Sequence, residues 1–120
     1  MILGFDVFKF GLESIDFNNN KVINTINSHS FITSIKDKDF KDSLKASDVL
    51  LPDGVGIVWA EKLLNSNKIS KIAGYDLFLF LMNKLNDENG SVFFLGGTVK
   101  TLLKIKIKCE IEYPNVSFSS

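Results

Sequence analysis

Three short loops of the sequence carry residue types that could bind and transform a ligand. Each loop follows an apolar run: TINSH at 25–29, LPDGVG at 51–56 and LGGT at 95–98. Glycine in such a loop lets backbone N–H groups approach a ligand, and a following helix N-terminus favours a phosphate. The pair Gly96 and Gly97 therefore fits a nucleotide diphosphate, although a tight structural turn is a somewhat stronger explanation of these two residues.

Asp53 stands between Pro52 and Gly54, at the end of the second apolar run. A carboxylate in such a loop could act as a general base that takes the proton of an attacking hydroxyl. A turn or N-cap aspartate explains the position equally well. Thr25 and Asn27 could bond to a sugar hydroxyl, or equally to the neighbouring backbone.

Two familiar nucleotide-binding motifs are not supported. Gly54-Val55-Gly56 begins like the dinucleotide fingerprint G-x-G-x-x-G, but Trp59 stands where the third glycine would be. A nicotinamide-dependent oxidoreductase is therefore a distant alternative, and no G-x-x-x-x-G-K-[ST] sequence is present. We expect Trp59 and Tyr75 to pack in the core or at its rim.

Composition argues against His-based or Cys-based metal sites, disulfide scaffolds and nucleic-acid binding. His29 is the only histidine and Cys109 the only cysteine, so a His-based metal cluster, a Cys-based zinc site and a disulfide framework cannot form. We expect Cys109 to be a small buried residue in a chain from a reducing compartment. The 14 basic residues balance the 14 acidic ones, which does not favour electrostatic capture of nucleic acid.

The loops must be positioned by strands that alternate with helices. Strand patterns cover 21–26, 48–51 and 91–95, with one or two further strands expected in 2–17 and the start of another at 116–118. Helical spacing covers 31–44, 57–64, 77–85 and 99–107, while 104–112 fits a helix or a strand equally.

Several residues mark the expected ends of these helices. Ser28 or Ser30 is predicted to cap the helix over 31–44, and Asp76 is predicted to cap the helix over 77–85. Gly90 is predicted to lie just past the C-terminus of that same helix.

This alternation predicts an α/β fold, a Rossmann-like layered arrangement with a mostly parallel sheet flanked by helices. We expect residues 1–120 to form a single domain. A strand that has barely begun at 116–118 leaves a sheet face without its covering helix. The sequence therefore predicts a truncated fold, the N-terminal part of a larger domain.

Four blocks of sequence together resemble a known enzyme family. The blocks are TIN at 25–27, SDVLLPDGVGIV at 47–58, AGYDL at 73–77, and VFFLGG at 92–97 with Tyr113-Pro114 after it. In order and spacing, from about Val22 onward, they are similar to the WecG/TagA/CpsF glycosyltransferases. The PDGxGIV and FLGG blocks together make this resemblance specific.

The resemblance implies transfer of a sugar, typically N-acetylmannosamine, from a UDP donor to a polyprenyl-diphosphate-linked N-acetylglucosamine. The reaction would proceed with inversion and without a cofactor or an essential metal. Family members are about twice as long as this chain, and a lipid acceptor implies work at the cytoplasmic face of the membrane, with peripheral membrane contact. A homo-oligomer is compatible with the resemblance.

The resemblance also implies roles for individual residues. Asp53 matches the proposed general base, and Thr25 and Asn27 match residues that line the same pocket. The matching glycines of the cleft are Gly54, Gly56, Gly96 and Gly97. Lys71 stands where many members carry a basic residue. Two alternatives stay open: a UDP-glucose-dependent hexosyltransferase of the same family, and a non-catalytic nucleotide-binding fragment.

Overall fold

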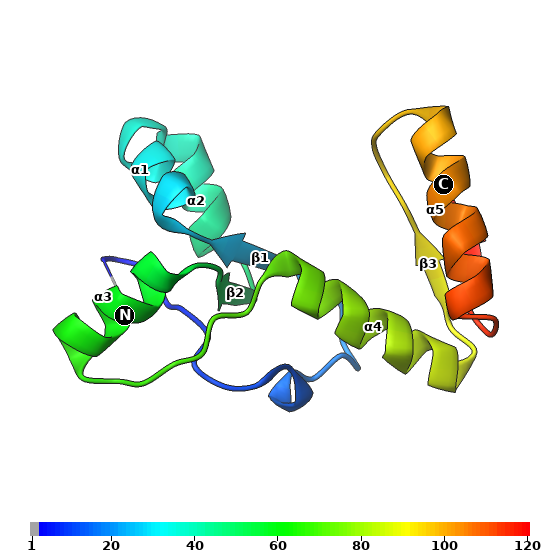
Figure 1. The fold of residues 1–120 in the computed structure, drawn as a ribbon. Coiled ribbons are helices and arrows are strands. Elements are labelled where there is room, and N and C mark those ends of the chain that lie inside the picture. Colours follow the sequence, from blue (N-terminus) through cyan, green and yellow to red (C-terminus); the bar gives the residue numbers. More distant parts are fainter. Residues whose placement is uncertain (1–2) are drawn as a thin grey trace. The chain divides into compact units, whose positions relative to one another are not determined.

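The structure is a computed structural model that describes residues 3–120. The chain divides into two compact units, the first ending at Leu77 and the second beginning at Phe78 (Figure 1). The single domain expected over 1–120 stays a prediction. Among residues 3–120, no helix has the length and apolar character needed to cross a membrane.

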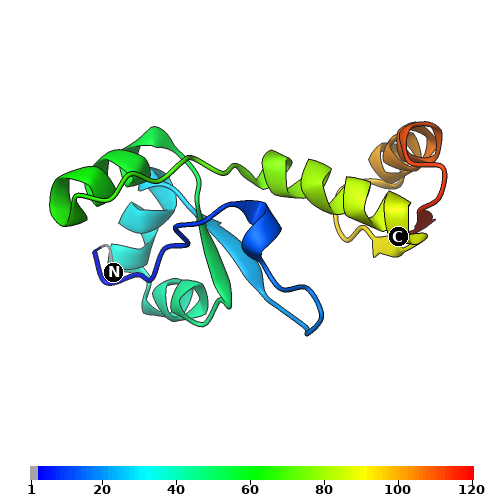
Figure 2. The same ribbon diagram turned by 90° about the horizontal axis from the view of Figure 1, so that it is seen from below.

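The first unit is built on two parallel strands, β1 (Ile23–Ile26) and β2 (Val49–Pro52), which lie side by side in Figure 2. Ile23 pairs with Val49, and Ile26 pairs with Pro52. The predicted strands over 21–26 and 48–51 are thus confirmed. The other edge of β2 is also bonded, because the amides of Phe8 and Ile72 each donate to it at 2.8 Å.

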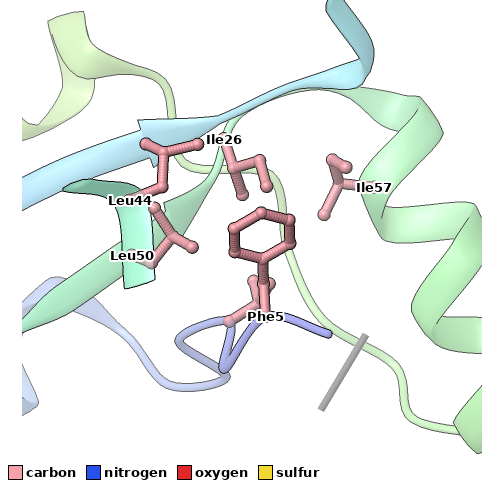
Figure 3. Close-up of a cluster of buried hydrophobic side chains, with 6 residues drawn as sticks. Phe5, Ile26, Leu44, Leu50 and Ile57 are labelled. Carbon is pink, nitrogen blue, oxygen red and sulfur yellow. The ribbon is translucent and has the colours of Figure 1, made fainter. Parts of the chain in front are cut away.

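Both faces of this strand pair are buried, which is typical of parallel sheets. One face packs with Phe5 and with the helices that follow each strand; Figure 3 shows this cluster, which contains Phe5, Val7, Ile26, Leu44, Leu50 and Ile57. The other face packs a second cluster of buried residues, Ile15, Val49, Leu51 and Ile72. Successive residues of each strand therefore serve opposite faces.

The prediction of a single helix over 31–44 is wrong, because the structure has two helices there, α1 (Ser28–Lys36) and α2 (Lys38–Lys45). Asp37 interrupts the helix with an extended backbone, and its carboxylate accepts a 2.9 Å hydrogen bond from the amide of Phe40. An aspartate that caps the next turn in this way ends one helix and starts another.

The strands expected over 2–17 are wrong for the described residues. The segment is irregular, with one 3-10 helix at Leu12–Ser14 and an isolated bridge at Phe5. Its apolar residues are divided between the two faces of the strand pair instead of lining one of them: Phe5 and Val7 join the first cluster, and Ile15 the second. Residues 1 and 2 lie outside the described residues.

After β2, helix α3 (Val55–Asn65) matches the helix predicted over 57–64. Helix α4 (Gly74–Glu88) matches the one predicted over 77–85, and Gly90 follows its end as expected. Asp76 is not its N-cap, because it lies within the first turn. Its carboxylate instead reaches back to accept a 2.8 Å hydrogen bond from the amide of Ala73.

The second unit contains most of α4, helix α5 (Val99–Glu112) and the parallel strands β3 (Ser91–Phe93) and β4 (Ser117–Ser119). Its core joins the helices to the strand pair through Met82, Cys109, Tyr113 and Val116. The ambiguous stretch 104–112 is helical, because Cys109 is buried in this core. Lysine and glutamate four residues apart also pair along α5.

The alternation of strands and helices, with parallel pairing in both units, confirms the predicted α/β class and is consistent with a truncated Rossmann-like fold. The first unit is the one that brings predicted site residues together.

Candidate active site

The carboxyl ends of β1 and β2 lie at the same edge of the first unit. Ile26 and Pro52 are paired, so Asn27 and Asp53 follow at neighbouring positions. The amide of Asp53 donates to the carbonyl of Ile26 at 2.9 Å. A Cβ built on Gly54 would lie 3.7 Å from the Cβ of Asn27. The sequence-predicted base and one predicted binding residue are thus neighbours.

Asp53 is half-buried, and its carboxylate has no hydrogen-bond partner among residues 3–120. It does not cap α3: the N-cap is Gly54, which has φ +121° and ψ 149° and makes no side-chain cap. That backbone conformation is essentially restricted to glycine, so the loop turns sharply here. The N-cap role that explained Asp53 equally well is therefore not formed, and the carboxylate is left for other chemistry.

Asn27 has a structural role as the N-cap of α1. Its Oδ1 accepts from the amide of Ser30 at 2.8 Å, and Ser30 Oγ accepts from the amide of Asn27 at 2.9 Å. This reciprocal pair is a capping box. The prediction that Ser28 or Ser30 is the cap is corrected, since Ser30 completes the box from inside the helix. The side-chain Nδ2 of Asn27 remains a donor for a ligand.

Thr25 and Gly56 complete the edge formed by β1 and β2. Thr25 pairs with Leu51 and is half-buried, two residues before the cap. A Cβ added to Gly56 would lie 2.3 Å from Ser28 Oγ, so the first turns of α1 and α3 approach each other closely. Helix N-termini carry unpaired N–H groups and partial positive charge, which suit an anionic group such as a phosphate.

Lys71 is exposed, and its backbone runs beside the carboxyl end of β2. The next residue, Ile72, donates its amide to the carbonyl of Pro52 at 2.8 Å. A flexible ammonium that starts from this position can serve a negatively charged ligand at the strand ends. This binding role stays a prediction.

Gly96 and Gly97 belong to the second unit, between β3 and α5. Both have positive φ, +111° and +76°, so a tight turn alone accounts for glycine at these positions. Thr98 then caps α5 by accepting from the amide of Thr101 at 3.2 Å. The diphosphate role of these glycines stays a prediction.

Comparison with known proteins decides the family. Residues 6–120 match the glycosyl transferase WecG/TagA/CpsF family. The chain belongs to this family. Over 105 residues it is 35% identical to the N-acetylglucosaminyldiphosphoundecaprenol N-acetyl-beta-D-mannosaminyltransferase of Bacillus subtilis (strain 168). The enzyme of the same name from Bacillus spizizenii is 29% identical over 105 residues. Each alignment covers 88% of this chain and 41% of the relative, so the chain spans about two fifths of their length.

In this member of the WecG/TagA/CpsF family, the structure also contains a buried carboxylate that the sequence analysis missed. Glu61 of α3 is fully buried. Its oxygens accept from the side-chain amides of Asn67 at 2.8 Å and Asn65 at 3.1 Å, and Lys9 Nζ lies 3.4 Å away. Burial alone would raise the pKa of Glu61, but the two amides and the charge of Lys9 outweigh it and lower the pKa. Glutamate in a helix otherwise indicates an exposed position, so composition gave no signal.

The structure overturns the expectation for two aromatic residues and confirms the one for the cysteine. Trp59 and Tyr75 are 66% and 67% exposed, so their expected place in the core or at its rim is wrong. Cys109 is buried as predicted, and burial raises the pKa of its thiol. Among residues 3–120, no group of three or more His, Cys, Asp or Glu side chains could hold a metal ion.

Proposed function

We propose that this protein transfers N-acetylmannosamine from a UDP donor to polyprenyl-diphosphate-linked N-acetylglucosamine. The observation that carries the proposal is the half-buried carboxylate of Asp53 at the carboxyl ends of β1 and β2, which does not cap a helix. Family membership supports it, as do the names of two relatives, both N-acetylmannosaminyltransferases that act on an undecaprenol-linked acceptor. Ligands of open α/β sheets bind at this end of the strands.

In the proposed reaction, the acceptor hydroxyl attacks the anomeric carbon of the donor sugar from the face opposite UDP. The new carbon–oxygen bond forms as the bond to the UDP oxygen breaks, which inverts the anomeric centre. Asp53 takes the hydroxyl proton and UDP leaves with the bonding electrons. A positioned base of this kind contributes about 10²–10⁴ in rate.

UDP develops negative charge as it leaves, and the protein supplies groups that stabilise it. The N-termini of α1 and α3 offer backbone N–H groups close to each other, and Lys71 offers an ammonium from the neighbouring segment. Thr25 and the side-chain Nδ2 of Asn27 orient the sugar.

The proposed acceptor is a lipid, so the protein would work at the cytoplasmic face of the membrane through peripheral contact. The sequence has a formal net charge of zero, so attraction to acidic lipid contributes little. Recognition of the acceptor's own sugar and diphosphate would bring the protein to the membrane.

The test is a transfer assay with the purified chain, a polyprenyl-diphosphate-linked N-acetylglucosamine in detergent, and either UDP-N-acetylmannosamine or UDP-glucose. We expect UDP release and disaccharide product with the first donor, at the same rate with and without EDTA. Product from UDP-glucose alone would favour the hexosyltransferase alternative. UDP binding without any product would favour the non-catalytic nucleotide-binding alternative, and loss of product in EDTA would contradict a metal-independent reaction.

A further inference from the structure

The mechanism proposed above does not use Glu61, although it is the one charged residue in residues 3–120 whose side chain is completely buried. Three cationic or amide donors converge on it: Asn67 Nδ2, Asn65 Nδ2 and Lys9 Nζ, at 2.8, 3.1 and 3.4 Å. A buried ion pair is often no more stabilising than apolar residues of the same volume. The bonds to this carboxylate instead fix the positions of Lys9 and Asn67 relative to α3.

One of those segments leads to the predicted donor-binding lysine. It leaves α3 after Asn65 and is held near its start by the bond from Asn67 to Glu61. At its end, the amide of Ile72 bonds to the carbonyl of Pro52. Lys71 lies between these two points, next to the second. The side chain of Ile69 adds an apolar contact with the first cluster.

We propose that Glu61 is a positioning residue that fixes the segment 66–72 and so holds Lys71 beside the carboxyl end of β2. The role of Lys71 in this inference rests on the proposed function. The claim that Glu61 fixes the segment 66–72 does not. Glu61 contacts the segment only through Asn67, so it acts on the ligand through another residue.

The test combines hydrogen exchange with calorimetric titration of UDP, on the whole chain and on Glu61→Gln. Glutamine keeps the size of the side chain but removes the charge and one acceptor. A hydrogen bond to a charged group is worth about 1.5–3 kcal/mol, which is roughly tenfold or more in an opening equilibrium. We expect the amide of Ile72, which donates to the carbonyl of Pro52, to exchange about tenfold faster while β1 and β2 keep their protection.

The UDP titration separates positioning from general stability. We expect Glu61→Gln to raise the Kd for UDP by about the same factor as Lys71→Ala, and the double variant to bind no more weakly than Lys71→Ala alone. Glu88→Gln is the matched control, because it removes an exposed helical carboxylate paired with Lys84 at 2.7 Å. It should leave both measurements unchanged.

Three results would overturn the inference: unchanged exchange at Ile72, exchange that accelerates equally in β1 and β2, or effects of Glu61→Gln and Lys71→Ala that add. If Glu61→Gln does not fold, Asn67→Ala removes the same link from the segment's side and should give the same local effect. If the unaltered chain does not bind UDP, the proposed function fails, and the exchange data still decide whether Glu61 fixes the segment.

Discussion

At the scale of single residues, Asn27 has one observed role, the cap of α1, and one proposed role, sugar binding. Two different substitutions can separate these roles. The Oδ1 of Asn27 caps α1, while its side-chain Nδ2 is proposed to contact the sugar. Serine is also a good N-cap, whereas alanine is not. The sequence left both roles open, a bond to a sugar hydroxyl or to the neighbouring backbone, because a short polar side chain after a strand is compatible with either.

We expect Asn27→Ala to lower the free energy of unfolding by about 0.5–2 kcal/mol, since the capping box is lost. Asn27→Ser should retain most of the stability because its hydroxyl can accept from the amide of Ser30. Both variants should bind UDP-N-acetylmannosamine more weakly, because both lack the side-chain Nδ2 that is proposed to contact the sugar. Urea unfolding and calorimetry measure the two effects, and equal stability of the two variants would contradict the capping role.

Glu61 makes the stability of the chain depend on pH in a defined direction. Its pKa in the folded protein is lowered from the usual 4.5, so its ionised form stabilises the fold. That contribution is complete above the unfolded-state value and is lost as the pH falls through the lowered pKa.

The difference in unfolding free energy between the unaltered chain and Glu61→Gln should therefore be largest at pH 7 and shrink as the pH falls from about 5 to about 3. Glutamine does not titrate, so only the unaltered chain carries this component. Urea unfolding at several pH values measures it. A difference that stays constant over this range would mean that Glu61 does not titrate with a lowered pKa.

At the scale of elements, the strands and helices that could be predicted are those bounded by local turn chemistry. The strand β2 ends at Pro52 and α4 ends before Gly90, and both ends were visible in the sequence. The division of α1 from α2 was missed because Asp37 lies among other charged residues and its capping bond to Phe40 is not distinctive there. The irregular segment up to Phe17 was missed because its apolar residues pack on both faces of the β1–β2 pair without forming a strand of their own.

The turn between β2 and α3 depends on the backbone of Gly54. We expect Gly54→Ala to destabilise the fold by about 1–3 kcal/mol, because φ of +121° is strained for any residue with a Cβ. Gly74→Ala is the control: no atom lies within 4 Å of its added Cβ, and it should be neutral or stabilise α4 by about 0.5–1 kcal/mol. Thermal unfolding compares them, and similar Tm values would contradict the strain.

The site residues at the strand ends could be predicted from the sequence, but the buried carboxylate of Glu61 could not. Asp53 and Asn27 were found because each follows an apolar run, and parallel strands bring such positions together. Glu61 was not found because its partners include Lys9, which is distant in sequence, and only the folded chain brings them together. Nonlocal polar contacts of this kind leave no periodic pattern in the sequence.

At the scale of the whole molecule, each unit has its own buried core, and the core of the second unit depends on Met82, which is 1% exposed. We expect Met82→Ala to destabilise this core by about 2–5 kcal/mol, measured by hydrogen exchange in β3 and α5. Leu103→Ala, at a position 55% exposed, should change it little. Equal effects of the two variants would contradict the assignment of the core.

Family membership applies to the chain as a whole, because the match extends over residues 6–120 and includes every candidate site residue in both units. The proposed activity rests on a smaller part of the molecule. The strand ends of the first unit bring Asp53, Asn27 and Gly54 together.

The central claim, that Asp53 is the general base, is tested most directly by Asp53→Asn in the transfer assay. Asparagine matches the carboxylate in size but cannot take the acceptor's proton, so we expect the rate to fall by about 10²–10⁴ while UDP binding and the circular dichroism spectrum are retained. Asp87→Asn, which removes an exposed carboxylate of α4, should keep its full rate. Turnover by Asp53→Asn at the unaltered rate would contradict the claim.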